Sequence, residues 1–350
     1  MNLEEYLKVT AEKVNCEIEK NFPKKASEKW VKYSLSEPEF GFDYSALQGA
    51  ITDPIWDFLL RGGKRWRPAL MLLSCSAVGG DENKALPFTV IPELVHNGTI
   101  MVDDVEDSSE LRRGKSATHL IFGIDVAVNA GNSMYYLPLN VLYNSSFSDS
   151  KKVMIYDAYS KEMIKLSLGQ GMDIYWHNGH NNAVTEAQYL QMCSYKTASL
   201  ARFAIKLGAI LGDASKEQIE ALESFATSIG VAFQIQDDVL NLKPKDGWGK
   251  EIGDDIHEGK RTLIVVNAFS KLNEKDSKKL VKILDSKKTT KKEIKEAISM
   301  LADCGSIDYA KEYAKKLVSE GWLKVDKVIP KSDSKVLLKE FADYLIERDI

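Results

Sequence analysis

The chain has 350 residues, a formal net charge of -4 and 44% hydrophobic residues. This composition supports a substantial buried core, and the negative charge argues against a nucleic-acid partner bound by bulk positive charge. The four cysteines form no C-x-x-C pair, which argues against a zinc site or a disulfide framework and is typical of a reducing cytosol. No stretch reaches the roughly 18 uninterrupted apolar residues of a membrane span. We expect a cytoplasmic protein without a transmembrane segment.

Apolar residues recur at helical spacing through most of the chain. One such stripe near the N-terminus contains Leu3, Leu7, Val14 and Ile18. Proline and glycine fall between the periodic segments, and alternating strand-like runs are scarce. There is no internal repeat, low-complexity linker or marked domain boundary. The sequence therefore predicts a single all-α domain over residues 1–350, with an irregular segment at about 24–53.

The first basic motif, GGKRWRP, covers residues 62–68 and combines a flexible turn with three cations. Its glycines let the backbone approach an anion closely, and an arginine fork matches phosphate oxygens in a bidentate way. Each of these cations, taken alone, is more often a surface charge than a ligand.

The first acidic cluster, DDVED, covers residues 103–107 and follows a run that reads as helix. On a helix Asp103 and Asp107 lie one turn apart, about 6 Å along the axis, and face the same way. Two like charges in these positions repel, so a bound cation would offset the cost. Carboxylate oxygens with water at the remaining positions suit magnesium, especially magnesium shared with substrate phosphates. Arg112 and Arg113 follow directly.

The second acidic cluster lies in QIQDDVLN, residues 234–241, after another apolar helical run. Asp237 and Asn241 repeat the one-turn spacing. Further cations stand before and after it, at Lys196, Lys250 and Lys260. A lone DDxxD is more often a solvated helix end than a metal site. Two clusters alternating with cations predict a site that binds two polyanions, one of them through metal.

Together these motifs resemble the short-chain trans-prenyl diphosphate synthases. The similarity runs from about Gly62 to Thr262 and continues more weakly to the C-terminus. The strings DDVEDSSELRRG and GQGMDIYW look most like the eukaryotic-type geranylgeranyl diphosphate synthases. The resemblance implies an antiparallel helical bundle around a deep central cavity, usually in a homodimer. It also implies condensation of isopentenyl diphosphate with an allylic diphosphate (dimethylallyl, geranyl or farnesyl), with Mg²⁺ as cofactor.

The resemblance assigns roles to residues that match the family's motifs. The implied magnesium ligands are Asp103, Asp107 and Asp237, with Asp104 and Asp238 supporting them. The groups implied to hold isopentenyl diphosphate are Lys64, Arg67, His96 and Arg113. The groups implied to hold the allylic diphosphate or to stabilise the cation are Arg112, Lys196, Thr197, Gln234, Lys250 and Lys260. Asn241 replaces the last carboxylate of the second motif, so we do not assign it to the metal.

In this family the helix that carries Asp103 also lines the tunnel for the growing chain. The residues four and five positions before Asp103 lie about one turn deeper. Here they are Thr99 and Gly98, both small, so the tail is expected to pass the fifteen-carbon stage. Tyr135 and Tyr136 are the next candidates for a floor, although two tyrosines without a gating role are also possible there. We predict geranylgeranyl diphosphate as the main product.

Other functions are open at this point. A farnesyl or longer polyprenyl diphosphate synthase would share the motifs, and so would a non-catalytic regulatory subunit of such an enzyme. A class I terpene cyclase would share the aspartate-rich helix and the ionisation chemistry. It would not need a second diphosphate site at Lys64, Arg67 and His96. Its second metal motif also usually has an Asn/Ser/Glu pattern, whereas this one begins with Asp237 and Asp238. Both acidic clusters are substantially present here, which favours a synthase over a regulatory subunit.

Overall fold

The computed structural model describes residues 1–181, 183–242, 252–286 and 288–347. Within these ranges the chain is almost entirely helical, and the strands are β1 (Leu111–Arg112) and β2 (Lys115–Ser116), which form one antiparallel pair. The predicted all-α class is confirmed. The chain divides into two compact units, the first unit being Met1–Asp157 with Leu207–Ala214 and the second unit being Ala158–Lys206 with Ser215–Ile350. The prediction that residues 1–350 form one domain stays a prediction.

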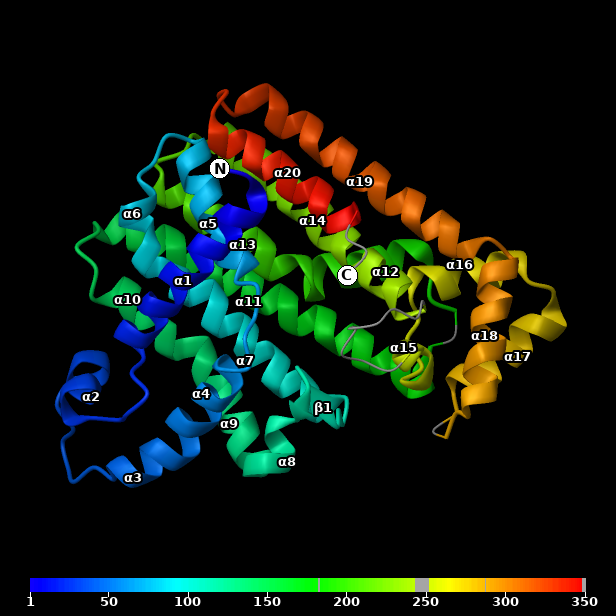
Figure 1. Cartoon of the computed structure of the whole chain (residues 1–350), viewed down its shortest axis with the longest axis horizontal. Helices are drawn as coiled ribbons and strands as arrows, with labels where there is room; N and C mark the ends of the chain where they lie inside the picture. Colours follow the sequence, from blue (N-terminus) through cyan, green and yellow to red (C-terminus); the bar gives the residue numbers. More distant parts are fainter. Residues whose placement is uncertain (182, 243–251, 287, 348–350) are drawn as a thin grey trace. The chain divides into compact units, whose positions relative to one another are not determined.

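The first unit contains the N-terminal elements (Figure 1). They are α1 (Leu3–Asn21), α2 (Glu28–Leu35), α3 (Tyr44–Leu47), η1 (Gln48–Thr52), α4 (Asp53–Leu59), α5 (Trp66–Ala77), α6 (Glu82–Ala85), η2 (Leu86–Thr89), α7 (Val90–Glu106), the two strands, α8 (Thr118–Phe122), α9 (Ile124–Tyr136), η3 (Leu137–Leu139) and α10 (Asn140–Tyr143). The unit also takes the beginning of α11 (Asp149–Tyr175) and the end of α13 (Ala198–Leu211).

Residues 24–53 are less irregular than the sequence suggests. They contain α2, α3 and η1, while no regular element covers residues 36–43. The Ser27 side chain accepts a hydrogen bond from the Trp30 backbone and so caps α2, and Asp43 caps α3 in the same way. The proline and glycine content of the stretch hid these short capped helices.

Two glycines allow α7 and α9 to pack closely inside the first unit. A Cβ atom on Gly98 would lie 2.6 Å from the Gly131 carbonyl oxygen and 2.9 Å from the Met134 Cβ. A Cβ atom on Gly131 would lie 2.7 Å from the Val102 side chain. Only glycine therefore fits at these contacts, and the helix that carries the first acidic cluster is fixed against α9.

The second unit contains the remaining helices. They are the rest of α11 and the start of α13, η4 (Trp176–His180), α12 (Glu186–Lys196), α14 (Lys216–Asn241), α15 (Asp254–His257), α16 (Leu263–Lys271), α17 (Glu274–Leu284), α18 (Lys291–Asp303), α19 (Ser306–Val328) and α20 (Asp333–Glu347).

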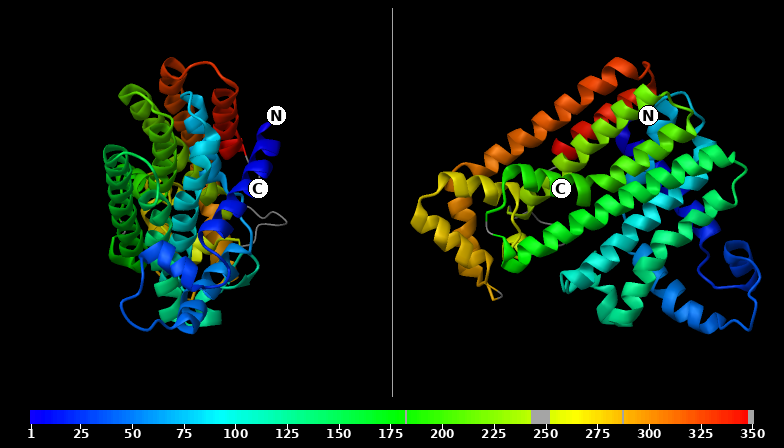
Figure 2. Two further views of the ribbon diagram at one scale, coloured as in Figure 1. Left: turned by 90° about the vertical axis from the view of Figure 1, so that its left-hand side faces the viewer. Right: turned by 180° about the vertical axis from the view of Figure 1, so that it is seen from behind.

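The longest helix pair of the second unit is formed by α14 and α19, which lie side by side in Figures 1 and 2. Gly321 of α19 leaves no room for a side chain, because a Cβ there would lie 2.6 Å from the Ser228 hydroxyl oxygen. This packing buries the apolar face of α14 and so supports the second acidic cluster near its end. Among the described residues, no helix combines the length and the apolar character that a membrane span requires.

Candidate active site

The GGKRWRP motif forms the turn that precedes α5. Gly62 and Gly63 have φ angles of 90° and 144°, and Arg65 before the helix has φ 49°, so the chain here adopts the left-handed conformations that favour glycine. The Arg65 side chain is buried, and its Nη1 donates to Glu93 Oε1 at 2.8 Å. Lys64 is exposed at the same turn. Arg65 is thus a structural residue that holds the turn to α7, rather than a third ligand.

Arg67 and His96 form a contact pair between α5 and α7. Arg67 Nη1 lies 2.9 Å from His96 Nε2, and the guanidinium carbon lies 4.0 Å from the centre of the Trp66 ring. Burial lowers the pKa of Arg67 to about 9. Burial, followed by the charges of Arg67 and Arg113, also holds the pKa of His96 well below its usual value. The imidazole is therefore neutral, and its Nε2 accepts the hydrogen bond from Arg67.

Arg113 joins this pair from the turn between β1 and β2. Its Nη1 donates to the Gly62 carbonyl oxygen, and its Nη2 donates to Asn97 Oδ1 at 3.2 Å. Burial lowers the pKa of Arg113 to about 10. The structure therefore brings Arg67, His96 and Arg113 into one electropositive group, in which the charges of both arginines act on His96. The sequence reasoning missed Asn97, although it lies in the ELVHN string before the first acidic cluster.

The first acidic cluster lies at the end of α7. The Asp107 backbone N–H donates to the Asp103 carbonyl oxygen at 2.8 Å, which confirms the predicted one-turn spacing. Both side chains are half-buried. Asp104 is fully buried, and its Oδ1 accepts from Arg112 Nε at 2.8 Å. Burial raises the pKa of Asp104, and Arg112 opposes that rise. Asp104 therefore anchors Arg112, and the half-buried Asp103 and Asp107 are better placed to take a metal.

The second acidic cluster lies on α14, where Asp237 is half-buried and Asp238 is buried. The Asp238 carboxylate accepts from Tyr189 at 2.7 Å and from Gln234 Nε2 at 2.8 Å. Burial, followed by the charge of Asp255, raises the pKa of Asp238 well above its usual value. Asp238 thus orients Gln234. Tyr189 was missed by the sequence reasoning, because nothing in the sequence links it to a residue 49 positions later.

Lys196 and Thr197 lie where α12 ends, and both donate hydrogen bonds to side chains of the second unit. Lys196 Nζ donates to Asp173 Oδ2 at 2.6 Å, and Thr197 Oγ1 donates to Gln234 Oε1 at 2.7 Å. Asp173 is buried and belongs to the GQGMDIYW string, which is the signal that could have identified it. The structure therefore brings together Thr197 and Gln234, two residues of the same predicted ligand set, and gives Lys196 a carboxylate partner.

The end of α14 also contacts the segment GDDIHEGKRT, residues 253–262. Asn241 Oδ1 accepts from the Asp255 backbone at 3.2 Å, so this amide serves a structural contact. Lys260 Nζ lies 3.6 Å from Asp255 Oδ1 and also pairs with Glu258. Lys250 lies outside the described residues.

The carboxylates suit a metal that is held jointly with substrate. Among the residues that the structure describes, no three His, Cys, Asp or Glu side chains form a group that could enclose an ion. A cage of protein ligands alone is therefore not seen in that part of the chain. Magnesium typically binds through one or two carboxylates plus substrate phosphates and water. The pair Asp103 and Asp107 offers such a donor set.

The predicted chain-length residues lie in the first unit. Gly98 is buried against α9, with its Cβ position 3.2 Å from the Tyr135 ring, and Thr99 is half-buried. Tyr135 is half-buried, and burial, followed by Glu106 and Asp103, raises its pKa. Tyr136 is 68% exposed. Of the predicted aromatic pair, Tyr135 therefore lies beside the helix that carries Asp103, and Tyr136 is the more exposed member.

Comparison with known proteins places these observations in a family. Residues 48–301 match the family model described as polyprenyl synthetase. The chain is 38% identical to a geranylgeranyl diphosphate synthase from Methanosarcina mazei over 82% of this chain and 86% of the relative. It is 34% identical to a geranylfarnesyl diphosphate synthase from Natronomonas pharaonis over 82% of this chain and 86% of the relative.

A solved structure agrees with these relatives. The crystal structure of a geranylgeranyl pyrophosphate synthetase from Pyrococcus horikoshii has a TM-score of 0.85 and 33% identity, with 99% of each chain covered. The likeness to eukaryotic-type enzymes stays a prediction. The family match and the identity of these relatives agree with the resemblance drawn from the motifs. The chain therefore belongs to the polyprenyl synthetase family and is a prenyltransferase of the all-α isoprenoid synthase fold.

Proposed function

We propose that this chain is a geranylgeranyl diphosphate synthase, which condenses isopentenyl diphosphate with an allylic diphosphate. The observation that supports this most is the gathering of Arg67, His96 and Arg113 in the same unit as the Asp103 cluster. A synthase needs a diphosphate site that uses no metal in addition to a metal-assisted one. A terpene cyclase needs only the second kind.

The proposed isopentenyl diphosphate ligands are Lys64, Arg67, His96 and Arg113. Arg67 is buried, and its positive charge is costly there without an anion. Its Nε has no hydrogen-bond partner among the residues that the structure describes. A diphosphate oxygen would provide that partner. His96 would accept from Arg67 and so keep its guanidinium turned toward the ligand. Lys64, exposed at the turn, would contribute a further charge.

The proposed allylic diphosphate ligands are Arg112, Lys196, Thr197, Gln234, Lys250 and Lys260. Arg112 is oriented by Asp104, and Gln234 is oriented by Thr197 and Asp238. These preorganised donors would stabilise the charge that builds on the departing diphosphate. Because the released diphosphate can take the proton, the reaction requires no protein base.

The proposed cofactor is Mg²⁺, held by Asp103, Asp107 and Asp237, with Asp104 and Asp238 supporting these ligands from buried positions. When bound, the metal would supply Lewis-acid stabilisation of the leaving diphosphate. The half-buried carboxylates of Asp103 and Asp107 repel each other in its absence. Hard oxygen donors of this kind favour magnesium over softer metals.

Product length is proposed to depend on Thr99. Gly98 cannot be enlarged without disturbing the contact between α7 and α9, so a bulky residue there would change packing as well as the tunnel. Thr99→Phe is the cleaner probe, and it should shorten the product to fifteen carbons. Thr99→Val, which keeps the volume of the side chain, is the matched control and should leave the product unchanged. An unchanged product from Thr99→Phe would contradict this account.

The function is tested by incubating the purified chain with Mg²⁺, isopentenyl diphosphate and each allylic diphosphate in turn. The expected result is a dominant twenty-carbon product whose formation is abolished by EDTA. A fifteen-carbon or twenty-five-carbon end product would keep the chemistry and overturn the proposed length. Absence of condensation with every primer would favour the regulatory-subunit alternative.

A homodimer is proposed as the assembly. The part of α11 in the second unit exposes Ile164, Leu168 and Tyr175 along one face, which is the kind of apolar stripe that a second copy would cover. Light scattering should give twice the chain mass, and Ile164→Glu should reduce it to the monomer. Leu323→Glu, at an equally exposed position on α19, is the control. A monomeric parent chain would refute the proposal.

The cytoplasm is the proposed location. All four cysteines, Cys16, Cys75, Cys193 and Cys304, are unpaired in the structure, as is usual in a reducing compartment. Fractionation of cells with an antibody to the chain would test it. Recovery with a membrane or secreted fraction would count against it.

A further inference from the structure

Two of the proposed diphosphate ligands lie at a break between helices. Lys196 is the last residue of α12, Thr197 follows as its C-cap, and α13 begins at Ala198. The last carbonyls of a helix have no partner inside that helix. The backbone at such a break can move unless other groups hold it, and any movement here would carry Lys196 and Thr197 with it.

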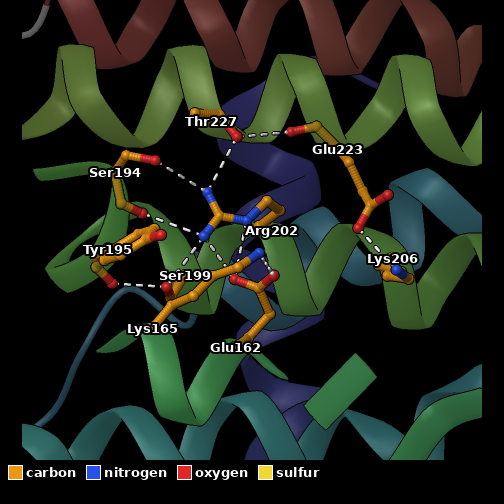
Figure 3. Close-up of polar contacts among 9 residues, drawn as sticks. All are labelled: Glu162, Lys165, Ser194, Tyr195, Ser199, Arg202, Lys206, Glu223 and Thr227. Carbon is orange, nitrogen blue, oxygen red and sulfur yellow. Dashed lines mark hydrogen bonds and ion pairs between the residues drawn. The ribbon is translucent and has the colours of Figure 1, made fainter. Parts of the chain in front are cut away.

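The Arg202 side chain, which is 6% exposed, supplies these partners from the second turn of α13. Its Nη2 donates to the Ser194 carbonyl oxygen at 3.2 Å and to the Ser199 hydroxyl at 3.1 Å (Figure 3). The Ser199 hydroxyl in turn donates to the Tyr195 carbonyl oxygen at 2.6 Å. Two carbonyls of the last turn of α12 are therefore held, directly or through Ser199, by one guanidinium.

Neighbouring helices fix the guanidinium itself. Arg202 Nε and Nη2 donate to Glu162 Oε2 of α11 at 2.9 and 2.6 Å, and Nη1 donates to the Thr227 hydroxyl of α14 at 3.1 Å (Figure 3). Burial alone would raise the pKa of Glu162, but Arg202 and Lys165 hold it below its usual value. Arg202 and Glu162 are thus both charged at neutral pH. Their hydrogen bonds, with that to Thr227, orient the Arg202 guanidinium.

Two glycines confine the backbone of the break from either side. A Cβ atom on Gly169 of α11 would lie 2.2 Å from the Lys196 backbone nitrogen. A Cβ atom on Gly230 of α14 would lie 2.5 Å from the Ala198 Cβ. The break is therefore seated directly on the backbones of both helices, in the same region that Arg202 ties together.

We propose that Arg202 is a positioning residue for the allylic diphosphate site. It acts through the backbone of residues 194–199, which sets where Lys196 reaches Asp173 and where Thr197 reaches Gln234. Arg202 contacts neither substrate in this proposal. The inference rests on the proposed function for its catalytic consequence, and on the hydrogen bonds described above for its structural one.

Steady-state kinetics of Arg202→Lys test the proposal. Lysine keeps the charge and loses the fork, so kcat/KM for the allylic diphosphate should fall about 10-fold to 100-fold. The KM for isopentenyl diphosphate should stay within about twofold of the parent value, since its proposed ligands lie elsewhere. Lys206→Met is the matched control. Lys206 is also on α13 and pairs with Glu223 of α14 at 2.8 Å, yet it does not contact the break (Figure 3).

The proposal would be overturned by a folded Arg202→Lys protein whose kcat/KM for the allylic diphosphate stays within twofold of the parent value. An equal loss for both substrates would also overturn it, because a general structural defect predicts that pattern. If Arg202→Lys does not fold, Thr227→Val removes one of the bonds that orient the guanidinium and should give a smaller loss of the same kind.

Hydrogen–deuterium exchange separates this proposal from the proposed function. Amides of residues 194–199 should exchange at least about tenfold faster in Arg202→Lys than in Lys206→Met, whether or not the parent chain is active. Unchanged exchange in that segment would refute the positioning role. An inactive parent chain with the expected exchange would refute the proposed function and leave the hydrogen-bonded break established.

Discussion

The two acidic helices, α7 and α14, carry the same pair of adjacent aspartates but compensate the buried member differently. Asp104 on α7 is an ion-pair partner of Arg112, only eight residues further along the chain. Asp238 on α14 instead accepts hydrogen bonds from two neutral groups, the Tyr189 hydroxyl and the Gln234 amide. The first cluster is completed locally by a short hairpin, and the second is completed by a helix far away in sequence.

This difference shows that the same pair of adjacent aspartates can be supported in two ways. Removing one partner of a buried ion pair strongly destabilises the folded protein, because the other charge stays buried without compensation. Where neutral donors hold a carboxyl group, replacing it with an amide should cost less folding stability. The contrast can be tested residue by residue.

Replacing the first aspartate of each pair should have the largest effect, and that effect should fall on activity. Asp103→Asn and Asp237→Asn remove proposed metal ligands, so kcat should fall by roughly 10²–10³-fold. The free energy of unfolding should change by less than about 1 kcal/mol for Asp103→Asn, because the lost repulsion from Asp107 is offset by the lost attraction to Arg112. Kinetics at saturating Mg²⁺ and urea unfolding measure the two quantities. Activity within about threefold of the parent would remove these residues from the metal site.

Asp104→Asn should have the largest effect on stability. It leaves the largely buried Arg112 guanidinium without its carboxylate partner, with only the charges of Asp103 and Asp107 near it, which should cost about 3 kcal/mol of unfolding free energy. Urea unfolding gives the value. Adding Arg112→Met to the same chain should recover most of the loss. A cost below about 1 kcal/mol would mean that the pair is not the support described here.

Tyr189→Phe should have an intermediate effect. It removes only a hydroxyl and leaves the Asp238 Oδ2 atom buried without its donor, at a cost of about 2 kcal/mol. Tyr33→Phe, at a side chain that is 49% exposed, is the control and should be nearly neutral. Equal effects of the two substitutions in urea unfolding would show that the buried hydroxyl contributes nothing specific.

Asp238→Asn should have the smallest effect and provides the sharpest comparison with Asp104→Asn. The amide keeps an acceptor for one of the two donors, Tyr189 and Gln234, and the cost of a buried charge is removed, so the two effects should offset each other to within about 1 kcal/mol. The same unfolding experiment measures both variants. If Asp238→Asn is as destabilising as Asp104→Asn, the two helices do not differ in the way proposed.

Much of the local structure could be predicted from the sequence. The helical spacing of Asp103 and Asp107 follows from their i, i+4 separation, and the α7 hydrogen bond confirms it. The helix before Gln234 and Asp237 was also expected, and α14 contains both residues. Periodicity and motif spacing predict structure of this kind, within a single helix.

Partners far apart in sequence could not be predicted in the same way. Arg65 reads as one of three cations in GGKRWRP, yet it is buried on Glu93, 28 residues away. Arg202 reads as an ordinary helical arginine, and only the approach of α11 and α14 shows why it is buried. Tertiary packing selects such partners, and a single sequence does not record it.

The first unit includes Leu207–Ala214, which has a consequence for how the chain is synthesised. A Cβ on Gly208 would lie 1.9 Å from the Met71 carbonyl oxygen, so this part of α13 is seated directly on the backbone of α5. The ribosome must first produce residues 158–206, which takes about 2–10 s at roughly 5–20 residues per second. During that interval the α5 surface around Met71 is not yet covered by α13. The first unit therefore cannot complete its packing during synthesis until Leu207–Ala214 has been made, well after residues 1–157.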